Sequence, residues 1–102
     1  MSVGGAGAVP VTDEHVEIAN ALRDEAQSKA QASGWNGIFA EFVVEEVLQQ
    51  IVAGKNYFIK ARVGGGKAVH MRVYADFSGG RTLNAVKLVE HTAALAYFES
   101  EL

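Results

Sequence analysis

The chain has 102 residues and a formal net charge of −3, with no cysteine. This length fits one domain, residues 1–102, and the acidic balance argues against a nucleic-acid partner. Without cysteine, the chain has no disulfide, no thiol nucleophile and no sulfur-ligated zinc. No run approaches the ~20 apolar residues of a membrane span, and the N-terminus lacks the pattern of a secretory signal. These features favour a cytoplasmic protein that does not cross a membrane, although a secreted chain after removal of its signal would look similar.

The N-terminal third predicts a flexible trunk followed by one helix. Residues 1–9 are small and glycine-rich, with nothing to anchor them to a core. Thr12 is a good N-cap, acidic residues follow it in the first turn, and Gly34 is placed to end the helix. One helical stripe carries small apolar residues that let a sheet approach closely: Val16, Ala19, Leu22, Ala26 and Ala30.

From Ile38 onward the pattern changes to strands. Segment 38–52 is rich in β-branched and aromatic residues, but its alternation slips at Glu45 and Glu46, which indicates a bulge or an edge position. Segments 56–63 and 68–75 alternate regularly, with these residues on one face: Tyr57, Ile59, Ala61, Val63, Val69, Met71, Val73 and Ala75.

The end of the chain is less regular. Segment 83–93 fits a helix about as well as a loop that leads into a strand, and segment 93–98 is expected to close the chain as a short strand. Trp35, just beyond the helix, is expected to pack on the sheet as an apolar cap. The fold class is therefore α+β, with a single helix packed across one face of an antiparallel sheet.

The turns between the strands have an expected arrangement. Turns are predicted at 53–56, 64–67 and 76–80, where glycine, asparagine and serine gather. In an antiparallel meander alternate hairpins point the same way, so the first and third turns should meet at one end of the sheet. The first turn carries Ile51 and Val52 toward water, which soluble proteins seldom do without a partner. Two apolar loops with a mobile trunk nearby would form a narrow wedge that suits a cleft.

Signals for catalysis are weak. His15, His70 and His91 lie far apart in the sequence, and His70 is expected to be an ordinary surface residue. The stretch "GGGK" at 64–67 fails as a phosphate-binding loop, because Ala68 stands where a serine or threonine should hold magnesium. The sequence predicts no enzyme, no catalytic residue, no metal site and no cofactor.

The three features at the wedge end resemble one known family. Gln50, Val52 and Gly54 match the motif Gln-x-Val-x-Gly, and "NYFIKARV" at 56–63 and "HMRVY" at 70–74 follow in the expected order. These residues resemble the cystatin superfamily, and within it the stefins, which are reversible inhibitors of papain-like cysteine proteases. The resemblance covers nearly the whole chain and is closest at 50–74.

The resemblance implies a function and a set of contact residues. The chain is expected to be a tight-binding competitive inhibitor that fills the active-site cleft of a cathepsin-like protease. The expected protease-binding residues lie in the trunk, the first loop and the second loop: Val3, Gly4, Gln50, Ile51, Val52, Ala53, Gly54, Phe77, Ser78 and Gly79.

Two alternatives stay open at this point. Stefins commonly carry Leu-Pro or Pro-His in the second loop, where this chain has Phe77 and Ser78, so the contribution of that loop is open. The chain could also be a cystatin-like binding or structural module without inhibitory activity. It is expected to be mainly a monomer, with strand exchange near Val52 and Ala53 as a route to a domain-swapped dimer.

Overall fold

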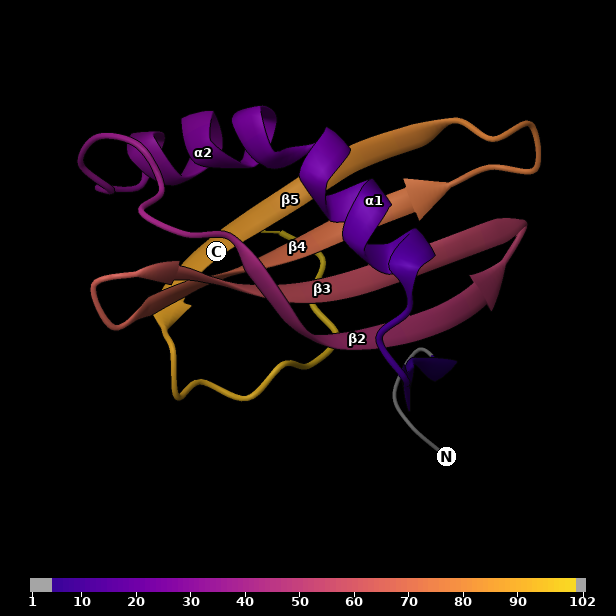
Figure 1. Cartoon of the computed structure of the whole chain (residues 1–102). Coiled ribbons are helices and arrows are strands. Elements are labelled where there is room, and N and C mark those ends of the chain that lie inside the picture. The colour runs from indigo at the N-terminus through magenta and orange to yellow at the C-terminus, as the bar shows by residue number, and fades with distance from the viewer. Residues whose placement is uncertain (1–4, 101–102) are drawn as a thin grey trace.

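Five antiparallel strands form one sheet in which the strands lie in chain order (Figure 1). The computed structural model describes residues 5–100. The strands are β1 (Gly7–Val9), β2 (Val43–Val52), β3 (Gly54–Gly64), β4 (Lys67–Ala75) and β5 (Arg81–Glu90). Helices α1 (Asp13–Ala21) and α2 (Arg23–Ala32) cover one face of the sheet. The predicted α+β fold is confirmed.

The expected single helix is divided into two segments at Leu22. This residue has φ −103° and ψ 6°, outside the helical range, and α2 begins immediately after it. The division lets α1 pack near β2 while α2 contacts β4 and β5. Ile18, absent from the predicted stripe, is buried, whereas Val16 is exposed. Neither helix within residues 5–100 is long and apolar enough to cross a membrane.

The predicted helix ends are confirmed. Thr12 caps α1 by accepting a hydrogen bond from the backbone N–H of His15, and Nδ1 of His15 accepts one from the N–H of Thr12 at 3.1 Å. This is a capping box with histidine in the place usually taken by Glu or Gln. Gly34 has φ +112° directly after the C-cap of α2, a conformation that favours glycine.

The strand pattern of the sequence corresponds closely to the sheet. The register between β2 and β3 shifts between Val44 and Glu46, which confirms the irregularity predicted there. The turns 64–67 and 76–80 also lie as predicted. The first turn is tighter than expected, because Val52 already pairs with Gly54, and Lys55 and Asn56 belong to β3.

Two buried clusters lie on opposite faces of the sheet. The helix-side cluster contains Tyr57, Ile59, Met71 and Val73, with Trp35 packed against it. The opposite cluster consists of Ala6, Phe58, Ala85, Leu95 and Phe98, with Leu48 and Tyr97 packed against it. The sheet is therefore covered on both sides, by the helices on one and by the end of the chain on the other (Figure 1).

Three expectations about the termini require correction. Segment 83–93 is mostly the long strand β5, and segment 93–98 forms no strand but crosses the sheet as irregular chain. Residues 7–9, assigned to the flexible trunk, pair with Val47–Gln49 as strand β1. The C-terminal segment buries its apolar residues against a face of the sheet. Because it does not lie beside an edge strand, its backbone forms no hydrogen-bonded pairing with the sheet.

His70 was expected to be a surface residue, and this is wrong. Its side chain is only 4% exposed, because residues beyond β5 cover this face of the sheet. Burial, together with the nearby charges of Lys60 and Lys87, lowers the pKa of His70 to about 4. The alternation of β4 placed His70 on the correct face, but nothing within β4 indicates that other residues cover this face.

Candidate functional site

Three exposed apolar side chains lie at the sheet end where two hairpins meet. Ile51 and Val52 end β2, and Phe77 lies in the turn between β4 and β5. Their exposed fractions are 68%, 41% and 87%. Both hairpins point to the same end of the sheet, while the β3–β4 hairpin points the opposite way (Figure 1). The predicted meeting of the first and third turns is confirmed.

The first loop is a very tight turn whose shape depends on Gly54. This residue has φ +107°, a backbone conformation that residues with a side chain rarely adopt. An added Cβ would also collide with the carbonyl oxygen of Ala75. The hydroxyl of Tyr74 donates a hydrogen bond to the carbonyl of Ala53, the residue at the tip. The tip is thus held against the neighbouring strand β4.

Gln50 is held inside the same hairpin. The Nδ2 of Asn56, a buried residue directly opposite in β3, donates a hydrogen bond to Oε1 of Gln50 at 2.8 Å. A buried amide needs such a partner to avoid a desolvation cost. This contact fixes the side chain of Gln50 against the hairpin on which Ile51 and Val52 project.

The second loop is braced by one carboxylate. Oδ1 of Asp76 accepts hydrogen bonds from the backbone N–H groups of Ser78 at 2.9 Å and Gly80 at 2.8 Å. Arg81 donates to the carbonyl of Gly79 at 2.7 Å. The sequence reasoning missed this bracing, although an aspartate at the start of a Gly-rich turn is a signal for it. The loop presents Phe77 from a held backbone.

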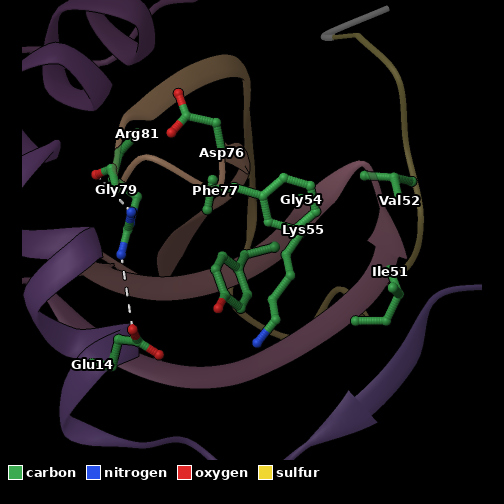
Figure 2. Close-up of a pocket in the computed structure, with 11 residues that line it drawn as sticks. Glu14, Ile51, Val52, Gly54, Lys55, Asp76, Phe77, Gly79 and Arg81 are labelled. Carbon is green, nitrogen blue, oxygen red and sulfur yellow. Dashed lines mark hydrogen bonds and ion pairs between the residues drawn. The ribbon is translucent and has the colours of Figure 1, made fainter.

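A pocket of about 430 Å³ lies between the two loops. Among the expected contact residues, Ile51, Val52, Gly54, Phe77 and Gly79 line it, while Gln50, Ala53 and Ser78 lie in the same loops outside its lining. Charged residues that sequence reasoning did not select also line it: Glu14, Lys55, Asp76 and Arg81. Figure 2 shows Arg81 directed toward Glu14, with 3.8 Å between Nη2 and Oε2.

The N-terminal segment approaches this end of the sheet from its edge. Val3 and Gly4 lie outside the described residues. Strand β1 runs antiparallel to β2, with Gly7 opposite Gln49 and Val9 opposite Val47. Followed from Val9 back to Gly7, β1 therefore runs toward the end of β2 that carries the first loop.

The arrangement suits burial in a groove better than bond-breaking chemistry. The edge is apolar, its loops are held by internal hydrogen bonds, and the pocket behind it carries two basic and two acidic residues. Within residues 5–100, no three His, Asp or Glu side chains gather as metal ligands would. Such an edge can lose contact with water when it enters an apolar cleft.

Comparison with known proteins gives consistent similarities. A model of the cystatin domain matches residues 7–96. The chain is 34% identical over 103 residues to Cystatin-B of Paralichthys olivaceus, an alignment that covers 96% of this chain and 100% of that protein. It is 41% identical over 86 residues to Cystatin-A2 of Dictyostelium discoideum, with 83% and 84% covered. It is 38% identical over 74 residues to Cystatin-A of Mus musculus, with 72% and 71% covered.

Proposed function

The chain belongs to the cystatin family and to its stefin subfamily, and on that premise we propose that it is a reversible, tight-binding competitive inhibitor of papain-like cysteine proteases. Its partners would be cathepsin-like enzymes, and its place of action the cytoplasm. The observation that carries the proposal is that Ile51, Val52 and Phe77 are exposed apolar side chains in two loops at one end of the sheet.

The mechanism is occlusion of the active-site cleft. Ile51 and Val52 would lose their remaining contact with water against the cleft walls, and Phe77 would do the same from the second loop. Burying a whole side chain of this kind contributes about 1.5–3 kcal/mol. Gly54 allows the tight turn that brings Ile51 and Val52 to the tip, and Gln50 keeps the hairpin in shape through Asn56.

The trunk supplies a third contact in this proposal. Val3 would occupy an apolar subsite on the non-primed side of the cleft, and Gly4 would turn the chain away from the catalytic cysteine. No peptide bond of the inhibitor then lies in position for attack, so the protein is not consumed as a substrate.

The hydrogen bonds within the two loops explain how a small contact surface can bind tightly. The Tyr74–Ala53 and Asp76–Ser78 hydrogen bonds hold both loops before binding. Preformed loops lose little conformational entropy on docking, so more of the contact energy remains as affinity. A nanomolar Kd corresponds to about −12 kcal/mol.

A titration of active papain with the purified protein tests the proposal. We expect competitive, reversible inhibition of papain and none of trypsin or chymotrypsin, because the edge carries no extended loop that a serine protease could accept as substrate. Unchanged papain activity at micromolar protein would refute it and favour a non-inhibitory binding module. An extended panel of papain-like endopeptidases and exopeptidases would then identify the preferred enzyme class.

A further inference from the structure

The chain after β5 forms a strap across the sheet face opposite the helices. This C-terminal strap, residues 91–100, begins at the far end of the sheet, where the N–H of His91 donates to the carbonyl of Gly66 at 2.9 Å. It contains no strand and therefore has no ladder of backbone hydrogen bonds. Its position depends on side chains of the sheet.

Three basic side chains of the sheet hold the strap. Nζ of Lys60 donates to the carbonyl of Ala93 at 3.0 Å, and Nη1 of Arg72 donates to the carbonyl of Phe98 at 2.9 Å. The guanidinium of Arg72 also lies 5.4 Å from the ring centre of Tyr97, and Nζ of Lys87 lies 5.3 Å from that of Phe98. Cation–π contacts at these distances are stabilising.

The strap shares its buried cluster with the N-terminal segment. Ala6, just before β1, is buried together with Leu95 and Phe98, and Leu48 of β2 packs against the same group. Strand β1 itself pairs over only three residues, at the edge of the sheet. So short an edge strand is weakly held by its ladder, and the apolar contact of Ala6 is its second anchor.

We propose that the C-terminal strap, through its buried residues Leu95 and Phe98, positions the N-terminal segment beside the loops that enter the protease cleft. This inference rests on the proposed function. The strap would act through Ala6 and β1 rather than by touching the protease, so Leu95 is a positioning residue. Because Ala6 is buried in this cluster and β1 pairs with β2, the N-terminal segment would start from a fixed point, and less ordering is left to occur during binding.

The test is a double-mutant cycle between the strap and the trunk. Leu95→Ala is made in the full-length protein and in a protein lacking Met1 to Gly4, and papain binding is measured for all four by stopped-flow. In the full-length protein we expect dissociation to become about three- to tenfold faster, with association nearly unchanged. In the truncated protein, Leu95→Ala should change dissociation less than about twofold, because the element that Leu95 positions is gone.

Leu88→Ala is the matched control. It makes the same truncation at a partly buried leucine of β5 that packs against the helix-side cluster. This variant should alter the melting temperature, but its effect on dissociation should be the same with and without the trunk. If Leu95→Ala loosens a larger part of the fold, the smaller cavity of Leu95→Val should give the same pattern at lower amplitude.

Amide hydrogen exchange gives a readout that needs no protease. Exchange at Gly7–Val9 should become faster in Leu95→Ala and stay unchanged in Leu88→Ala. Equal effects of Leu95→Ala in the full-length and truncated proteins, or unchanged exchange in β1, would overturn the inference while leaving papain inhibition by the parent protein intact. Absence of inhibition by the parent protein would instead refute the proposed function.

Discussion

Replacing Val52 by aspartate separates binding from folding at the first loop. In the free protein 41% of the surface of Val52 is exposed. Burial of this exposed part in a cleft would contribute roughly 0.6–1.2 kcal/mol. An aspartate loses this term and adds a carboxylate, and an unpaired polar group in an apolar site costs roughly 1–3 kcal/mol. Binding should therefore weaken by about 2–4 kcal/mol, or about 30- to 1,000-fold in Kd. Lys55 lines the same pocket and, by pairing with the aspartate, would bring the loss toward the lower end.

The fold should tolerate this change. Val52 is the last residue of β2 and belongs to neither buried cluster, so the free energy of unfolding should change by only about 0.5–1 kcal/mol. The matched control is Ile38→Asp. Ile38 is also exposed, at 75%, but it precedes β2 near the opposite end of the sheet. This variant should inhibit papain like the parent protein.

The assay combines inhibition constants for papain with thermal melts of the three proteins. If Val52→Asp binds as tightly as the parent, the first loop is not the part that enters the cleft. If it unfolds, Val52 contributes to the core more than its exposure indicates. Equal losses for Val52→Asp and Ile38→Asp would point to a general effect of added charge.

Four other expectations follow from the same geometry. Deleting Met1 to Gly4 should weaken papain binding roughly ten- to a hundredfold, mainly through faster dissociation, with little change in melting temperature; equal dissociation rates would show that the trunk is idle. Gly54→Ala should lower the free energy of unfolding by about 1–3 kcal/mol, measured by urea titration, because the side chain is strained at φ +107° and meets Ala75. His70 is neutral when buried, with a pKa of about 4 in the folded protein against 6.5 in the unfolded chain, so its contribution to stability is full above pH 6.5 and disappears as the pH falls toward 4. The free energy of unfolding, measured by urea titration, should fall by up to about 3 kcal/mol over this range. The variant His70→Leu should show a flatter dependence of this free energy on pH. Mild heating should yield a dimer by strand exchange at Ala53, separable by size-exclusion chromatography, and retention of full inhibition by that dimer would contradict our placement of the binding edge in the first loop.

Local patterns predicted the sheet well. Alternation placed Tyr57, Ile59, Met71 and Val73 on one face, and their burial against the helices agrees with it. The broken alternation near Glu45 corresponds to a real shift of register. These features depend on neighbouring residues along one strand, which is the information that periodicity contains.

The errors came from contacts between distant parts of the chain. The burial of His70 depends on residues about 23 positions later, and nothing in β4 alone indicates that they return across its outer face. The C-terminal segment crosses this face of the sheet, and Leu95 and Phe98 pack onto it. This packing explains why residues 93–98 are mostly apolar although they form no strand. Strand β1 was missed because three small residues, Gly7 to Val9, carry too short a pattern.

The position of the candidate site was predictable from the sequence, but the hydrogen bonds that hold its loops were not predicted. The alternation of hairpins in an antiparallel sheet predicted Ile51, Val52 and Phe77 at the same end of the sheet, and the structure places them there. The partners that hold the loops come from strand interiors and from a turn: Tyr74, Asn56 and Asp76. Tyr74 and Asn56 are ordinary polar residues in the sequence, and their roles become visible only when the register across the sheet is known. Asp76 acts within its own turn, where its position ahead of two glycines is a local signal.

Stability and binding are carried by different parts of this sheet, and Gly54 is where they meet. The two clusters hold the fold, so side chains at the exposed edge can change the affinity at little cost in stability. Gly54 differs because its backbone closes the hairpin and also lines the pocket between the loops. A side chain there would push against the carbonyl of Ala75, next to the second loop, and so would displace the two loops relative to each other. Any loss of binding at this position therefore includes a loss of loop geometry, whereas a substitution at Val52, whose side chain belongs to neither cluster, leaves the turn at Gly54 unchanged.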